Sequence, residues 1–177
     1  MSWDSIHYEA KLAAIQAHEG QLYSDIFPYE KHLTDAVNVG KRYGFDGDII
    51  TAIWLHDSIE DGNLTYNKIR DNFGKRVAEM VFAVTDELGR NRKERKAKTY
   101  PKIRENRDAI IVKLLDRIAN IEHGLKHNSP QLEMYVKENR EFYTNLFSPS
   151  IRTDLMWEYV NDLILKAKNE LCKTEKF

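Results

Sequence analysis

The shortage of turn-forming residues constrains this chain more than any other feature of its sequence. Glycine occurs 8 times and proline 4 times, 12 of 177 positions, whereas average usage would make these two residues roughly 12% of a chain. A β-sandwich or barrel needs turn residues about every 8–12 positions. The shortage therefore argues against such folds and favours an all-α fold of long helices joined by short connections.

The composition narrows the class of protein further. Charged residues make up 31% of the chain and apolar residues 42%, enough for a core beneath a heavily charged surface. The 27 basic and 28 acidic side chains nearly cancel, which excludes a strongly basic nucleic-acid-binding protein. A single cysteine, Cys172, excludes a disulfide framework. With no signal peptide and no apolar run near the roughly 18 residues of a membrane span, we expect a cytoplasmic protein.

Apolar residues recur at helical spacing through most of the sequence, without internal repeats or long linkers. The pattern predicts helices over residues 5–19, 29–43, 49–61, 65–73, 75–88, 108–127, 130–147 and 150–171. Irregular or polar segments are expected at residues 20–28 and 89–98. Gly44 and Gly62 are placed to end helices. We therefore expect residues 1–177 to form one compact, single-domain helical bundle.

The most informative segment is HDSIED, which runs from His56 to Asp61. On a helix, His56 would face Glu60 and Asp57 would face Asp61, one turn apart. Like charges at this spacing cost about 0.2–0.5 kcal/mol per pair, and a helix C-terminus also disfavours anions. A divalent metal would remove both penalties, and histidine with carboxylates suits Mn, Fe, Zn or Co. Without a metal, the same patch would be a solvated acidic helix end.

A second polar pattern lies on the strongly apolar segment 110–121, which predicts a central helix. Its polar residues form one stripe at helical spacing: Lys113, Asp116, Arg117 and Asn120. The stripe faces either solvent or an internal cleft. In a cleft, Asp116 could ligate a metal, and Asn120 could orient a substrate or a water molecule.

His32 lies at the edge of the apolar side of its predicted helix, where it is either a packing residue or a further ligand. The other histidines have no comparable partners and are interpreted as surface or packing residues: His7, His18, His123 and His127. Six basic residues fall within nine positions: Arg90, Arg92, Lys93, Arg95, Lys96 and Lys98. This basic cluster either binds phosphate groups or forms a solvated loop and helix start.

The order His32, His56-Asp57 and Asp116 resembles the HD superfamily of metal-dependent phosphohydrolases, which are helical bundles. Within it, HDSIED is similar to the HDxxED box of (p)ppGpp hydrolases. Shorter segments also look like those of that group: PYEKH, FGKRV, VTD, RKERK and VKLLDRIAN. The resemblance covers about residues 10–125 and leaves no room for a synthetase domain. It implies a stand-alone small alarmone hydrolase, with C-terminal helices over residues 129–171 completing the bundle.

The resemblance also implies roles for individual residues. A divalent metal, usually Mn²⁺ in this family, would be held by His32, His56, Asp57 and Asp116. Glu60 and Asp61 would position or activate the attacking water. Asn120 would contact the nucleotide, and Arg92 and Lys96 would meet its phosphate groups. The implied reaction removes the 3′-pyrophosphate from guanosine tetra- or pentaphosphate, a small polyphosphorylated nucleotide.

One stretch departs from the family's pattern. An Arg-Lys pair often follows the glutamine after the first helix and lines the nucleobase pocket, but Gln21 is followed here by Leu-Tyr-Ser-Asp. Tyr23 or Phe27 could stack on a base instead. The departure keeps a second reading open, an HD phosphohydrolase on another nucleotide, such as a 5′-nucleotidase or an NADPH phosphatase. A third reading is a helical binding module without catalysis, which would bind no metal.

Overall fold

Side-chain caps and glycines begin and end several helices. A computed structural model describes residues 3–150 and 152–174. The single domain predicted over residues 1–177 also includes residues 1–2, 151 and 175–177, which lie outside the described residues. The Thr65 side chain accepts a hydrogen bond from the backbone N–H of Lys68 and starts a helix there. Gly74, at φ 88°, ends that helix in a conformation that favours glycine.

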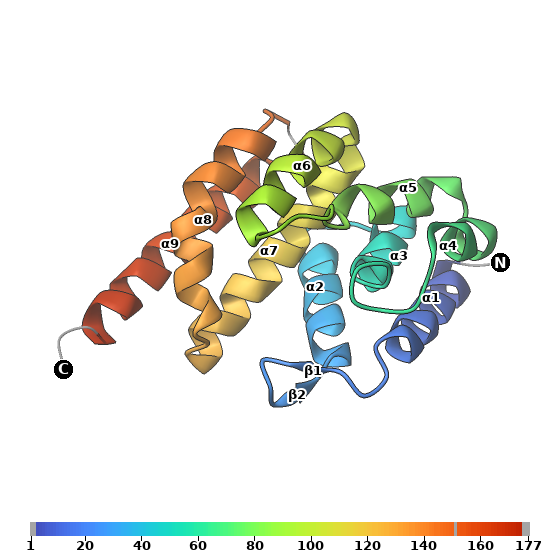
Figure 1. Ribbon diagram of the computed structural model, residues 1–177, viewed down its shortest axis with the longest axis horizontal. Helices are drawn as coiled ribbons and strands as arrows, with labels where there is room; N and C mark the ends of the chain where they lie inside the picture. The colour runs from blue at the N-terminus through green and yellow to red at the C-terminus, as the bar shows by residue number, and fades with distance from the viewer. Residues whose placement is uncertain (1–2, 151, 175–177) are drawn as a thin grey trace.

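The described residues form nine helices and one small antiparallel sheet (Figure 1). The helices are α1 (Trp3–Ala17), α2 (Glu30–Arg42), α3 (Gly47–Leu55), α4 (Tyr66–Phe73), α5 (Lys75–Val84), α6 (Arg92–Glu105), α7 (Arg107–His127), α8 (Gln131–Leu146) and α9 (Asp154–Thr174). The sheet pairs β1 (Leu22–Tyr23) with β2 (Phe27–Pro28), with Leu22 opposite Pro28. The prediction of an all-α fold is confirmed. None of these helices is long and apolar enough to cross a membrane.

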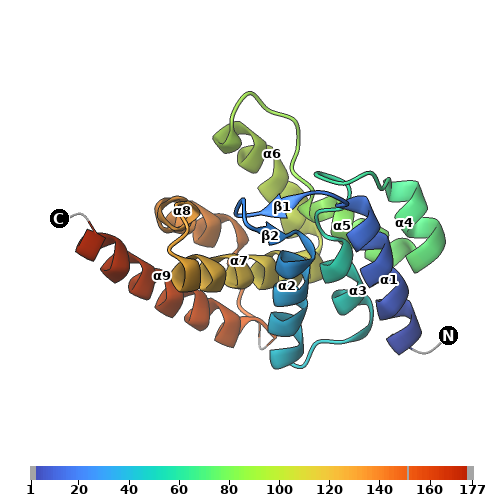
Figure 2. The same ribbon diagram turned by 90° about the horizontal axis from the view of Figure 1, so that it is seen from below.

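Helix α7 is the central element, as its apolar sequence predicts. It contacts α2, α3, α5, α6, α8 and α9. Figure 2 shows α7 crossing the molecule, with α8 and α9 on one side and α1, α3, α4 and α5 on the other. Leu114, Leu115 and Ile118 are fully buried in it. A helix enclosed in this way can present polar side chains only to a cleft or to other buried groups.

Helix ends differ most from the sequence prediction around the HDSIED segment. The helix predicted over residues 49–61 ends at Leu55, and residues 56–61 form hydrogen-bonded turns. The N–H of Ser58 donates to the carbonyl of Leu55, and the N–H of Asp61 donates to that of Asp57. Repulsion among the carboxylates and the helix dipole both disfavour a continued helix there.

Two segments predicted as irregular or polar contain regular structure. Residues 20–28 hold the β1–β2 hairpin, whose turn residues Ser24 and Asp25 have φ of 52° and 61°. The segment 89–98, predicted only as basic and polar, contains the start of α6, which begins at Arg92 and includes Pro101. The missed signal is Asn91, whose side chain accepts a hydrogen bond from the N–H three residues ahead, as an N-cap does.

Candidate functional site

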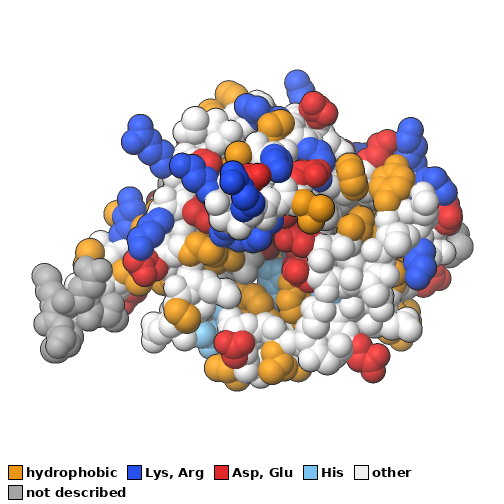
Figure 3. Space-filling model, viewed as in Figure 1, with side chains coloured by type: hydrophobic (Ala, Val, Ile, Leu, Met, Phe, Trp, Pro, Cys, Tyr) orange, Lys and Arg blue, Asp and Glu red, His pale blue; other side chains and the backbone are white. Residues whose placement is uncertain are grey.

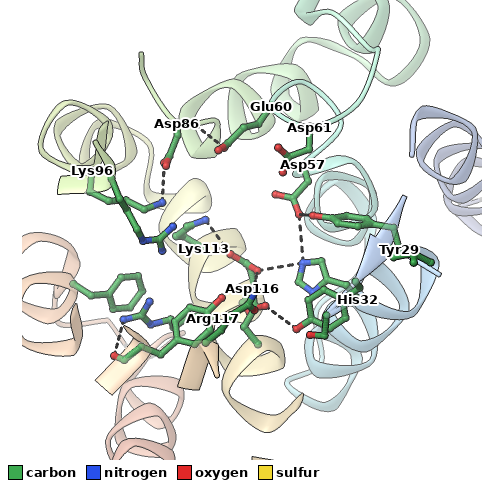
Figure 4. Close-up of a pocket in the computed structure, with 18 of the residues that line it drawn as sticks. Tyr29, His32, Asp57, Glu60, Asp61, Asp86, Lys96, Lys113, Asp116 and Arg117 are labelled. Atoms are coloured by element: carbon green, nitrogen blue, oxygen red, sulfur yellow. Dashed lines mark hydrogen bonds and ion pairs between the residues drawn. The ribbon is translucent and has the colours of Figure 1, made fainter. Parts of the chain in front are cut away.

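Two histidines and two aspartates from three elements meet at one point. His32 comes from α2, His56 and Asp57 from the turn after α3, and Asp116 from α7. The two histidine Nε2 atoms are 3.1 Å apart. Asp57 Oδ2 lies 3.0 and 3.4 Å from the Nε2 atoms of His56 and His32, and Asp116 Oδ1 lies 3.6 and 3.4 Å from them. We call these four residues the histidine–aspartate cluster; Figure 4 labels His32, Asp57 and Asp116.

The chemistry of the cluster fits a divalent metal. Nδ1 of His56 is 2.8 Å from the carbonyl oxygen of Ile53, which accepts its proton and turns Nε2 toward the other three residues. Ligating histidines are held in this way in metal sites, with the far ring nitrogen on a carbonyl or carboxylate. His32, His56 and Asp57 alone already bring one ligand atom each within 4.8 Å of one another. Two imidazoles and two carboxylates suit transition metals.

Neighbouring side chains hold the two aspartates in place. The hydroxyl of Tyr29 donates to Asp57 Oδ2 at 2.7 Å, and the ammonium of Lys113 donates to Asp116 Oδ2 at 2.9 Å. Burial raises the pKa of Asp57, but the charges and hydrogen bonds of His56 and His32 outweigh it and lower this pKa well below its usual value. Burial also raises the pKa of Asp116, but the charge of Lys113 and the hydrogen bond of His56 outweigh it and lower this pKa. Both carboxylates are therefore anionic at neutral pH.

A cleft of about 310 Å³ opens beside the cluster. Its acidic side is formed by Asp57, Glu60 and Asp61, and Asp86 contacts both Glu60 and Lys96. Its other side, which we call the basic wall, is formed by Arg92, Lys96, Lys113 and Arg117. Figure 3 shows this hollow with carboxylates and histidine inside it and with lysine and arginine side chains gathered above it. The polar stripe of α7 therefore faces the cleft.

Glu60 and Asp61 lie on the acidic side, where Figure 4 shows their carboxylates near that of Asp57. Glu60 Oε2 accepts a hydrogen bond from the backbone N–H of Asp86 at 2.9 Å. Burial raises the pKa of Glu60 and that of Asp61. A carboxylate with a raised pKa is a better proton acceptor, and this property suits a general base.

Asn120 and Tyr23 line the cleft and contact each other. The Tyr23 hydroxyl donates to Asn120 Oδ1 at 2.8 Å, and Asn120 Nδ2 donates to the carboxylate of Asp116. The ring of Tyr23 is stacked on that of His32, with centroids 4.8 Å apart. Phe27 instead packs against His123 and is absent from the lining of the cleft. Tyr23 therefore buttresses the cluster as well as facing the cleft.

Of the six residues in the basic cluster of the sequence, Arg92 and Lys96 line the cleft. Each already has a carboxylate partner. Arg92 makes two hydrogen bonds to Glu138, at 2.6 and 3.1 Å, and Lys96 donates to Asp86 Oδ1 at 2.8 Å. Arg90 and Lys98, also in that cluster, both pair with Glu94 away from the cleft.

Sequence reasoning assigned no role to several residues that complete the site. Tyr29 stands inside the PYEKH segment and could have been found there, three positions before His32. Asp86 ends the VTD segment. Glu138 carries no signal in the sequence, because it is 46 residues from Arg92, and only the packing of α8 beside α6 brings the two together.

The chain is similar to known proteins in sequence. The chain is 32% identical over 124 residues to the guanosine-3′,5′-bis(diphosphate) 3′-pyrophosphohydrolase of Aquifex aeolicus (strain VF5), covering 67% of this chain and 18% of that relative. It is 32% identical over 145 residues to the bifunctional (p)ppGpp synthase/hydrolase SpoT of Escherichia coli (strain K12), covering 78% of this chain and 21% of that relative. The chain thus spans about a fifth of the length of these curated relatives.

The chain is also similar to a solved structure and to a protein family. The solved structure of a metazoan ortholog of SpoT, described as hydrolysing ppGpp, matches with a TM-score of 0.74, 21% identity, and coverage of 89% of this chain and 94% of that chain. This likeness shows a shared fold. The family described as HD domain matches residues 10–149 and includes the whole histidine–aspartate cluster. This chain therefore belongs to the HD domain family.

Proposed function

We propose that this protein is a metal-dependent hydrolase that removes the 3′-pyrophosphate from guanosine tetra- or pentaphosphate. The observation that carries the proposal is the position of the histidine–aspartate cluster beside one cleft, which Glu60, Asp61 and the basic wall also line. Two of the similar proteins named above are hydrolases of this nucleotide. The reaction adds water across the bond between the ribose 3′-oxygen and the pyrophosphate group.

The metal of the proposal is Mn²⁺, held by His32, His56, Asp57 and Asp116. When bound, a divalent metal supplies Lewis-acid polarisation of water and of phosphoryl oxygens. Tyr29 orients Asp57 for this role through its hydroxyl, in the way that outer hydrogen bonds fix metal ligands.

The remaining cleft residues act either on the attacking water or on the substrate. Glu60 and Asp61 accept the proton of the attacking water. Burial raises the pKa of both side chains, which makes their carboxylates better proton acceptors. Arg92 and Lys96 bind phosphate oxygens, and Asn120 and Tyr23 contact the nucleotide.

Gln131, Tyr135 and Phe142 of α8 line the same cleft, so we propose that the C-terminal helices belong to the functional unit. With Cys172 as a free cysteine, we place that unit in the cytoplasm.

An assay that reads pyrophosphate and phosphate separately tests this proposal. We expect the purified protein with Mn²⁺ to release pyrophosphate from ppGpp. His56→Ala and Asp57→Ala should abolish turnover and metal binding, whereas Glu60→Gln should keep metal binding and lose most turnover. Exposed His127 lies outside the cleft, so His127→Ala is the matched control and should keep both. Activity that survives in His56→Ala would show that the metal site is elsewhere.

One observation favours a second candidate, an HD phosphohydrolase on another nucleotide. The hairpin residues at the cleft, Leu22, Tyr23, Ser24 and Asp25, contain no basic side chain to lie against a guanine base. NADPH and 5′-nucleotides belong in the same assay for this reason. Phosphate released from one of them, with ppGpp left intact, would support this candidate and exclude the first.

A further inference from the structure

Glu138 on α8 holds the guanidinium of Arg92 in the geometry that a phosphate group would use. Arg92 Nε donates to Glu138 Oε1 at 2.6 Å, and Nη2 donates to Oε2 at 3.1 Å. Two parallel hydrogen bonds of this kind match a guanidinium to either a carboxylate or a phosphate. Nη1 of Arg117 lies 3.7 Å from Glu138 Oε2. One carboxylate therefore faces two arginines of the basic wall.

The contact between Arg92 and Glu138 is an ion pair that dissolved anions can reach. Burial raises the pKa of Glu138, but the hydrogen bonds and charge of Arg92, followed by the charge of Arg117, outweigh burial and lower it. Glu138 is therefore an anion at neutral pH. The side chains of Arg92 and Glu138 keep 37% and 22% of their surface exposed, so that an entering anion can approach the arginine.

We propose that Glu138 competes with the anionic part of the substrate for Arg92. In the free protein its carboxylate occupies the guanidinium, and a phosphate group displaces it on binding. A ligand must offer Arg92 more negative charge than one carboxylate does, which favours polyphosphates over weakly charged ligands. The identity of the polyphosphate rests on the proposed function, whereas the competition for one guanidinium does not.

A second carboxylate, Asp86, shows why Glu138 is the informative residue. Asp86 holds Lys96 through its side chain, but its backbone N–H also holds Glu60. A change at Asp86 would disturb substrate binding and the proposed general base together. Glu138 contacts Arg92 and Arg117, and its described hydrogen bonds and ion pairs reach neither Glu60 nor the histidine–aspartate cluster. Its substitution should therefore alter affinity more than turnover.

The test is Glu138→Gln, which keeps the shape of the side chain and removes its charge. Titration calorimetry with inorganic pyrophosphate should show binding that is about two- to fivefold tighter, the size expected for a partly exposed ion pair. The KM for ppGpp should fall in parallel, with a smaller change in kcat. Glu133→Gln is the matched control, because exposed Glu133 lies on the same helix and pairs with Lys137 outside the cleft.

The effect must also pass through Arg92. In an Arg92→Gln background, Glu138→Gln should no longer tighten pyrophosphate binding, as a double-mutant cycle requires for coupled residues. Unchanged or weaker binding in Glu138→Gln, or equal tightening without Arg92, would overturn the proposal. If Glu138→Gln does not fold, Glu138→Asp keeps the charge, withdraws it from Arg92 and should shift binding the same way. Pyrophosphate binding is read without turnover, so a protein inactive on ppGpp contradicts the proposed function alone.

Discussion

At the scale of single residues, the protonation of His56 sets the charge of the histidine–aspartate cluster. Burial lowers the pKa of His56, but the charges and hydrogen bonds of Asp57 and Asp116 outweigh burial and raise this pKa to about 10. The carbonyl of Ile53 keeps one proton on Nδ1. A second proton on the ring must therefore sit on Nε2, between His32 and the two carboxylates. In the absence of metal, His56 is a cation at pH 7.

Metal binding should expel this proton. We expect about one proton to be released when Mn²⁺ binds at pH 7, because a ligating imidazole must be neutral. The affinity for Mn²⁺ should rise with pH as the competing proton is lost, toward the pKa of about 10. Calorimetry in two buffers with different ionisation enthalpies measures the release. Equal heats of binding in the two buffers would mean that Nε2 of His56 carries no proton before the metal binds.

The residues of the site differ in how far the sequence could identify them. The order of the four cluster residues resembles that of the HD superfamily, and this resemblance, rather than any one of the residues, predicts a metal site. The spacing of Lys113 and Asp116 allows a contact between them, but it does not say where in the molecule that contact lies. Lys113 was identified as part of a stripe, but its ammonium could equally have paired in solvent. Only its burial in the cleft makes its contact with Asp116 a property of the site.

At the scale of elements, the ends of α7 show what local sequence can decide. Asn106 accepts hydrogen bonds from the backbone N–H groups of Asp108 and Ala109 and begins the helix. Asn128, in the left-handed conformation at φ 51°, follows its last residue. Both are local signals, and the predicted limits of 108–127 are correct to within one residue at the start. The HDSIED turn had no such stop signal before Gly62.

Removing the cap of α7 should separate stability from metal binding. Asn106→Ala leaves two N–H groups without an acceptor and should lower the free energy of unfolding by about 1 kcal/mol. Asp116 lies more than two turns into the helix, so the affinity for Mn²⁺ should not change. Urea unfolding and a metal titration measure the two effects. Asn106→Ser, which keeps a capping side chain, should restore most of the stability; equal loss in both variants would argue against the cap.

At the scale of the whole molecule, the histidine–aspartate cluster joins parts of the chain that are distant in sequence. His32 and Asp116 belong to α2 and α7, whose packing against each other and against α3 forms much of the core. A metal bound by all four residues would therefore bind the folded chain in preference to the unfolded one. Such a ligand stabilises the fold by mass action.

Metal removal should lower the melting temperature. At a Mn²⁺ concentration of about 100 times Kd, the expected stabilisation is about 2.7 kcal/mol, visible as a rise in Tm that a chelator reverses. The same titration on Asp57→Ala should give little or no rise, since that variant lacks one ligand. A rise of equal size in Asp57→Ala would place the stabilising metal at another site.

The sequence by itself determined the fold class, the rough limits of eight of the nine described helices, and the residue types of the histidine–aspartate cluster. Those properties depend on local patterns: apolar spacing, capping residues and a short motif. The tertiary structure decided which side of α7 faces a cleft, and that Asp86 and Glu138 hold the basic wall. Glu138 joins α8 to α6 and α7, and Asp86 lies in the connection between α5 and α6. Such contacts depend on packing, that is, on the summed burial of many side chains, which no short segment encodes.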